Sequence, residues 1–354
     1  MDGLDRMFEE SDKEVYVAVN NDVSTMRNEE IEGRSIYPST RLLLSSLDSK
    51  YDVSVIKSED YLEGENVGKI YELVNKGRDS YLVEKDERKS KVTGDLLFIR
   101  GTEHKSFSTR EEFDKIIDHL DEYSENFEYV INDLSAEWLA ERKDKYEELD
   151  DVPTLKNYDV SGPGEFEDLL EEKGKIIKKP IIGGQGLDVQ LLENDMGMDD
   201  IEEMFGDENI DEYLFQEFIP GRRDRRIVFI NDNYLGKGFE IIGSREIRNR
   251  DTPWGPENEV VEKERLRYKP SKREEEITRS IAEQTGMTYG CADFVVLPQE
   301  LRKQETMESK IMEINGACTG LKTRRKVSGE RGEREFIYQL AMPVNEYVDE
   351  LLED

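Results

Sequence analysis

Short apolar runs alternate with helical stripes through the first third of the chain. Four runs have the length and the β-branched content of strands, and a helical stripe of leucines spans Tyr37 to Leu47. A helix is also expected from about Thr109, because Glu111 and Glu112 suit the positive end of a helix dipole. The strand candidates are Val15 to Val19, Val53 to Ile56, Leu96 to Ile99 and Val130 to Asn132. This alternation predicts an N-terminal α/β domain over residues 1–135.

A change of pattern follows. The chain is helical from Asp133 to Glu148, is broken at Val152-Pro153-Thr154, and then becomes rich in short β-type runs separated by glycine-containing loops. Such short spacings predict antiparallel meanders, divided here between residues 136–220 and 221–354. The runs are Ile176 to Ile182, Leu187 to Leu192, Leu214 to Ile219, Arg226 to Ile230, Leu235 to Ile242, Ala292 to Leu297 and Lys310 to Asn315, before a closing helix with Leu340, Val344, Tyr347 and Leu351.

Composition narrows the class of protein. The 354 residues are 36% hydrophobic and 38% charged, and no apolar run approaches the roughly 20 residues that cross a bilayer. The N-terminus lacks the apolar core of a secretion signal, so a cytoplasmic location is expected. A formal net charge of −33 argues against nucleic-acid and membrane partners, and it suggests a halophilic source or a virus of one. Acidic clusters, such as Glu274 to Glu276 and Asp199 to Glu203, are interpreted as solvated helix faces.

Two carboxylates and an amide near the C-terminus form the first candidate site. Glu313 and Asn315 are two apart in a strand-like run and therefore leave the same face of a sheet. If this run pairs antiparallel with Ala292 to Leu297, Asp293 should fall opposite Ile314 or Asn315. Oxygen ligands of this kind favour Mg²⁺, with Mn²⁺ as an alternative. The spacing is equally compatible with a structural alternative, in which Asp293 caps the end of a strand and Glu313 is an exposed strand residue.

Further upstream, lysines and glycines predict contacts with phosphate. Lys178 and Lys179 precede a glycine loop whose backbone N–H groups can approach phosphate closely, although an ordinary glycine hairpin fits as well. The run Phe215 to Gly221 is an apolar strand ending in a turn, which suits an adenine ring. Four arginines follow, of which one is expected to enter the site; they are Arg222, Arg223, Arg225 and Arg226.

In their order, these elements resemble the ATP-grasp superfamily, most closely its glutathione-synthetase-like branch with the ribosomal-protein glutamate ligases. The resemblance implies two α+β subdomains that clasp ATP, preceded by an α/β domain. The elements that carry it are Asp144-Lys145, Lys179-Pro180, Gly183-Gly184-Gln185-Gly186, Gln216-Glu217-Phe218-Ile219, Asp224-Arg225-Arg226, Asp293 and Glu313-Ile314-Asn315-Gly316.

The resemblance also implies roles for individual residues. Lys145, Lys179 and the loop Gly183, Gly184, Gln185 and Gly186 would contact the ATP phosphates, while Glu217 and Phe218 would hold adenine and Asp224 would support the nucleotide. Asp293, Glu313 and Asn315 would bind Mg²⁺. Arg226 and Arg248 would face the transferred phosphate or the acyl phosphate. Asn258 is an alternative to the Asn249 that follows Arg248.

The reaction implied is ligation of a carboxylate to an amine through an acyl phosphate, with release of ADP and phosphate. The carboxylate substrate and the amine acceptor would be an amino acid, a peptide or a protein tail, and homo-oligomerisation stays open. Two alternatives remain: an ATP-grasp kinase, and a non-catalytic nucleotide-binding or structural interaction module.

Overall fold

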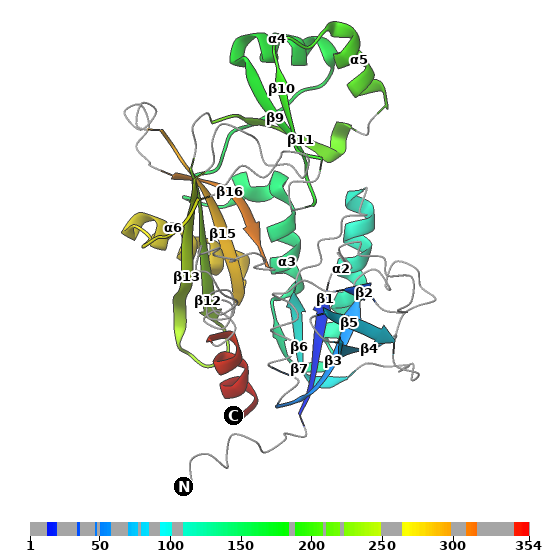
Figure 1. The fold of residues 1–354 in the computed structure, drawn as a ribbon, viewed down its shortest axis with the longest axis vertical. Coiled ribbons are helices and arrows are strands. Elements are labelled where there is room, and N and C mark those ends of the chain that lie inside the picture. Colours follow the sequence, from blue (N-terminus) through cyan, green and yellow to red (C-terminus); the bar gives the residue numbers. More distant parts are fainter. Residues whose placement is uncertain are drawn as a thin grey trace.

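Three β-sheets organise the chain in a computed structural model (Figure 1). They hold seven, four and five strands within the part of the chain that the structure describes. That part comprises residues 13–19, 34–35, 47, 50–57, 70–76, 79–84, 93–100, 109–183, 188–207, 210–219, 223–248, 264–298, 309–316 and 343–353. None of its helices is long and apolar enough to span a membrane.

The seven-stranded sheet is the N-terminal α/β layer, in the order β2-β5-β4-β3-β1-β6-β7. Its parallel centre contains the four strands expected from the sequence: β1 (Glu14–Val19), β3 (Asp52–Lys57), β6 (Gly94–Arg100) and β7 (Phe127–Ile131). The helix α2 (Arg110–Ser124) begins as expected, with the Thr109 side chain accepting a hydrogen bond from the Glu112 amide. It covers one face through Ile116 and Leu120.

The outer strands of this sheet were not anticipated. They are antiparallel to their neighbours, and two of them form a hairpin; their bounds are β2 (Arg34–Ser35), β4 (Tyr71–Lys76) and β5 (Asp79–Glu84). Polar residues interrupt these runs, as is common at sheet edges. The helical stripe from Tyr37 lies outside the described residues, except for Leu47.

The four-stranded sheet has the order β10-β9-β11-β8 and is antiparallel, as the meander pattern predicts. Its strands are β8 (Asn157–Tyr158), β9 (Lys175–Pro180), β10 (Gln190–Glu193) and β11 (Tyr213–Glu217). Two helices, α4 (Pro163–Lys173) and α5 (Met198–Asp207), pack Phe166, Leu170 and Ile201 against it. The exposed acidic side chains of α5 confirm the solvated face expected there. Figure 1 shows this lobe above the rest of the molecule.

The five-stranded sheet has the order β14-β13-β12-β15-β16. Its strands are β12 (Arg223–Asp232), β13 (Gly238–Arg248), β14 (Glu264–Arg267), β15 (Tyr289–Val296) and β16 (Ser309–Asn315). The predicted antiparallel pairing of the last two is confirmed. The helix α6 (Lys272–Thr285) covers one face of the sheet, where Ile277 and Ile281 share a core with Ile227, Phe294 and Ile314.

A final helix over residues 343–353 joins the first sheet to the third. Val344, Val348 and Leu351 lie in one apolar core with Val17 of β1 and Val228 of β12. The closing helix expected from the sequence is thus confirmed, apart from Leu340, which lies outside the described residues. The first and third sheets form a common base. The helix α3 (Leu134–Glu141) and the short 3-10 helix η3 (Lys143–Glu148) continue from β7 toward the four-stranded lobe.

Candidate active site

Asp293 and Glu313 face each other across the hairpin of β15 and β16. The sequence placed Asp293 opposite Ile314 or Asn315, and this register is wrong by at least one position. Asn315 still reaches the same carboxylate, because its side-chain amide donates to Asp293 Oδ2 at 3.3 Å. Two carboxylates and one amide therefore share one face of the sheet, while Ile314 points into the core on the other.

An irregularity in the ladder accounts for the shift of register. Beyond the Asp293 and Glu313 pair, Phe294 lies opposite Ile311, which leaves Met312 without a partner on β15. Such an extra residue disrupts the ladder locally and frees backbone groups for other contacts. Lys179 Nζ of β9 donates to the Met312 carbonyl at 3.3 Å. The bulge thus receives a lysine from the four-stranded lobe.

Arg226 is the arginine that meets the acidic pair. It lies opposite Asp293 in the ladder of β12 and β15, and its guanidinium forks onto the carboxylate, with Nε 2.6 Å from Oδ1 and Nη2 on Oδ2. The Asp293 side chain is 8% exposed, so this charge is largely withdrawn from water. A bidentate contact of this geometry fixes both groups.

A second cation approaches from η3, and the sequence did not single it out. Lys143 Nζ lies 3.6 Å from Glu313 Oε1 and donates to the carbonyl of Gly183. The Lys143 side chain is 6% exposed, whereas Lys145 points outward and pairs with Glu148 at 2.7 Å. Sequence spacing offers both lysines equally, since they flank Asp144, and only the fold of η3 decides between them.

Tyr146 supports β16 from the same short helix. Its hydroxyl accepts from the Ile314 amide at 2.9 Å and lies within donating distance of the Ala140 and Ile314 carbonyls. Burial raises the pKa of this phenol well above its ordinary value, and the nearby Glu313 carboxylate raises it further. The hydroxyl therefore stays protonated and acts as a fixed hydrogen-bonding group beside the carboxylate strand.

The predicted nucleotide residues are distributed around the same junction. Gly183 has the positive φ of 127° that favours glycine, and Gly184, Gln185 and Gly186 lie outside the described residues. Glu217 accepts from Lys310 Nζ of β16 at 2.8 Å, a second link between the lobe and the base. Phe218 follows it and is partly buried.

Two other predicted residues lie on β12 and β13. Asp224 is 4% exposed, and its backbone faces Ile247 and Val295. Arg248 faces Arg223 in the ladder, and its side chain is outside the described set, as are Asn249 and Asn258. The roles of Asp224, Arg248, Asn249 and Asn258 therefore stay predictions.

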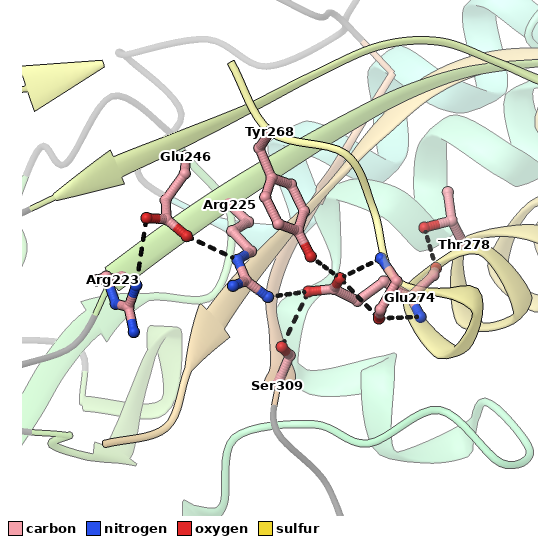
Figure 2. A network of polar contacts seen from close by, with 8 residues as sticks. Arg223, Arg225, Glu246, Tyr268, Glu274, Thr278 and Ser309 are labelled. Carbon is pink, nitrogen blue, oxygen red and sulfur yellow. Dashed lines mark hydrogen bonds and ion pairs between the residues drawn. The ribbon is translucent and has the colours of Figure 1, made fainter. Parts of the chain in front are cut away.

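The neighbouring Arg225 points to the opposite face of β12, into a buried ionic network (Figure 2). It donates to Glu246 at 3.0 Å and to Glu274 at 2.8 Å, and its guanidinium lies 4.1 Å from the centre of the Tyr268 ring. Ser309 of β16 also donates to Glu274, at 3.0 Å. The interpretation of Glu274 as part of a solvated helix face is therefore wrong: it is 2% exposed. A run of three glutamates does not show which one faces the core.

Replacing Glu274 by alanine is expected to destabilise the protein by about 3 kcal/mol, because it removes one of the two carboxylates that neutralise the buried Arg225 guanidinium and the acceptor of the Ser309 hydroxyl. Burial alone would raise the pKa of Glu274, but hydrogen bonds from Tyr268 and the Ser271 backbone outweigh it and lower the pKa. The stabilisation is thus present above the ordinary glutamate pKa of about 4.3 and is lost as pH falls through the folded value.

Urea unfolding as a function of pH measures this effect. The difference in unfolding free energy between wild type and Glu274→Gln should be greatest near neutral pH and should shrink below about pH 4.3. Glu276→Ala, at an exposed position on the same helix, is the matched control and should change the free energy by less than about 0.5 kcal/mol. A pH-independent difference for Glu274→Gln would contradict the prediction.

The middle of the chain matches a known family of domains. Residues 160–289 match the model of the prokaryotic glutathione synthetase ATP-grasp domain, a segment that includes β9, β11 and β12 and ends before Asp293. No curated protein sequence is significantly similar to the chain.

Solved structures extend the likeness to nearly the whole chain. The ATP-grasp ligase PsnB, complexed with a phosphomimetic variant of its minimal precursor, Mg and ADP, is 15% identical, with a TM-score of 0.56 over 98% of this chain and 99% of its own. The macrocyclase MdnC from Microcystis aeruginosa MRC, bound with precursor peptide MdnA, is 13% identical, with a TM-score of 0.55 over 96% and 100%. D-alanyl-alanine synthetase A from Vibrio cholerae O1 biovar eltor str. N16961 is 12% identical, with a TM-score of 0.50 over 87% and 90%.

At these identities, the structural likeness establishes the fold. The arrangement expected from the sequence, two α+β units preceded by an α/β layer, is the one observed. Residues 160–289 thus match a glutathione-synthetase-type ATP-grasp domain, and nearly the whole chain has the fold of the ATP-grasp ligases.

Proposed function

We propose that this protein is an ATP- and magnesium-dependent carboxylate–amine ligase that forms an amide bond through an acyl phosphate. The observation that carries the proposal is the opposed pair Asp293 and Glu313, with Arg226 and Lys143 on its two carboxylates and Lys179 reaching across from β9. Carboxylates that can bind a metal ion and cationic side chains that can bind phosphate thus lie together where the two ATP-grasp units meet.

The donor set fits magnesium. Within the described residues, no group of three or more Asp, Glu, His and Cys side chains converges as a metal cage. Mg²⁺ is usually bound by one or two carboxylates and completes its shell with water and phosphate oxygens, so Asp293, Glu313 and the Asn315 amide oxygen suffice. Bound there, Mg²⁺, or Mn²⁺ in its place, would neutralise charge on the transferred phosphoryl group.

The chain's own cations have separate tasks in this proposal. Lys143 and Lys179 hold phosphate oxygens of ATP, and Arg226 holds the oxygens of the acyl phosphate. A substrate carboxylate attacks the terminal phosphorus, ADP leaves, and an amine then attacks the acyl carbon and displaces phosphate. Both steps depend on positioning and charge neutralisation, because the protein forms no covalent bond with the substrates.

A peptide is the substrate class we favour. Two structures that share the fold over nearly the whole chain were solved with precursors: PsnB with a variant of its minimal precursor, and MdnC with precursor peptide MdnA. A free amino acid or a protein tail remains the alternative for either the carboxylate or the amine.

An ADP-release screen over amino acids, small acids and acidic peptides tests the proposal, with mass spectrometry of the products. Ligation requires both ADP and a product heavier by the amine minus water. A stable phosphorylated product without an amide would instead favour the kinase. Binding of ATP and Mg²⁺ without turnover by any pair would favour the non-catalytic module.

The acidic composition supports an adaptation to concentrated salt, and we propose that the protein acts in the cytoplasm of a high-salt organism or of a cell infected by its virus. With a net charge of −33, self-repulsion opposes the folded state at low ionic strength. Raising KCl from about 0.1 M to about 2 M, where the Debye length falls below about 3 Å, should therefore raise Tm by several degrees. Differential scanning calorimetry measures this, and an unchanged or falling Tm would contradict the adaptation.

A further inference from the structure

A buried asparagine and a buried glutamate lie where the N-terminal sheet meets the carboxylate strands. Asn132 follows β7 and Glu137 lies on α3, and both side chains are fully withdrawn from solvent. Asn132 Nδ2 donates to Glu137 Oε1 at 2.7 Å and lies 3.4 Å from the Gly316 carbonyl. On its other side, Asn132 Oδ1 accepts from the Tyr289 amide at 2.8 Å. One amide side chain thus contacts the first residue of β15 and the residue that follows β16.

The backbone at Asn132 is adapted to this contact. Its φ is 57°, in the left-handed region that asparagine adopts more readily than most residues. The turn directs the chain from β7 into α3, so the same residue ends a strand, aims its amide at two others and precedes the helix that supplies Glu137.

Gly316 touches this pair directly. A β-carbon placed on it would lie 1.8 Å from Glu137 Oε1 and 2.4 Å from Glu137 Cδ, distances that van der Waals repulsion forbids. The glutamate carboxyl therefore occupies the space that a side chain would take. Because Glu137 is buried and bonded to Asn132, it cannot move aside without breaking that hydrogen bond.

We propose that Asn132 and Glu137 are positioning residues that hold Asn315 and Asp293 in place for the metal, an inference that rests on the proposed function. Asn132 fixes the peptide after Asn315 and the beginning of the strand that carries Asp293. Groups that orient metal ligands without touching the metal typically contribute 10-fold to about 100-fold to metal affinity. The N-terminal sheet thereby sets the geometry of a site that contains none of its own residues.

Substitutions of Asn132 and Glu137 remove the positioning contacts in different ways. Asn132→Gly keeps the left-handed backbone but deletes the amide, and should weaken binding of Mn²⁺ with ADP by about 10-fold, measured by electron paramagnetic resonance. Asp151→Gly is the matched control, since Asp151 has the same φ of 57° on an exposed turn. Glu137→Gln keeps the oxygen that accepts from Asn132 and should retain affinity within about 2-fold, whereas Glu137→Ala should not.

The contact with Gly316 allows a suppressor test. Gly316→Ala should lower Mn²⁺ affinity by about 10-fold or more, and adding Glu137→Ala should recover part of that loss, since it vacates the colliding carboxyl. Gly164→Ala, at a glycine with open space around it, is the control and should bind as wild type does. Melting temperatures recorded for every variant separate loss of the site from loss of the fold.

The outcomes distinguish this inference from the proposed function. If wild type fails to bind Mn²⁺ with ADP, the proposed function falls. If wild type binds and Asn132→Gly and Gly316→Ala bind equally well, the positioning role is overturned while the function stands. It is also overturned if Gly316→Ala is weak and Glu137→Ala restores nothing, because the loss would then arise in the backbone. Partial recovery in the double variant supports it.

Discussion

Replacing Asp293 by asparagine is expected to lower kcat/KM for ADP formation by about 10³-fold, equivalent to about 4 kcal/mol of lost transition-state stabilisation. Asparagine preserves the size of the side chain and can still accept a hydrogen bond from Arg226, so the change removes chiefly the negative charge. That charge is the one that faces Glu313 across the hairpin. Steady-state assays over a range of MgCl₂ concentrations should show the loss, with partial recovery at high Mg²⁺ if affinity is the quantity impaired.

The other face of β12, the strand that carries Arg226, provides a matched control. Arg225 and Arg226 are adjacent on β12, and each is paired with a largely buried acid: Glu246 for the first and Asp293 for the second. Glu246→Gln should therefore lower stability in the same manner as Asp293→Asn, while Mg²⁺ dependence stays unchanged. Equal losses of activity in both variants would mean that ion pairing within the sheet, and not metal binding, explains the effect.

The sequence was sufficient for the elements whose patterns are local. The parallel strands β1, β3 and β6 are continuous apolar runs, as expected of strands covered on both faces. The hairpin of β15 and β16 could also be anticipated, together with the shared face of Glu313 and Asn315. Its register could not, because hairpin symmetry assumes an uninterrupted ladder and the unpaired Met312 breaks it.

What the sequence did not show depends on contacts between distant segments. Glu274 is one of three consecutive glutamates, and its burial depends on Arg225 and Ser309, which come from strands on either side of α6 in the chain. Asn132 reads as the end of a strand, yet its partners lie at residues 289 and 316. The burial and the partners of such residues follow only from the three-dimensional arrangement of the three sheets.

The second large effect is expected at Lys143. The family resemblance indicates Lys145 as the lysine that contacts the ATP phosphates, whereas the fold directs Lys143 toward the site. Arg142 forks onto Asp144 at 2.8 and 2.7 Å, and η3 then turns Lys143 inward to the carbonyl of Gly183 and to Glu313. Lys145 meets only Glu148 among its described side-chain contacts, at the surface.

Lys143→Ala should therefore lower kcat/KM by 10²-fold to about 10³-fold, the usual cost of removing one fixed cation from a transferring phosphoryl group. Lys145→Ala should change it by less than about 3-fold, since an exposed ion pair contributes roughly 0–1 kcal/mol. Lys143→Arg is informative as well: a guanidinium keeps the charge but does not fit the space between the Gly183 carbonyl and Glu313, so activity should recover only in part. ATP titrations followed by ADP release measure all three variants. If Lys145→Ala is the more damaged, η3 must rearrange when ATP binds, and the phosphate contact passes to the lysine that the family resemblance indicated.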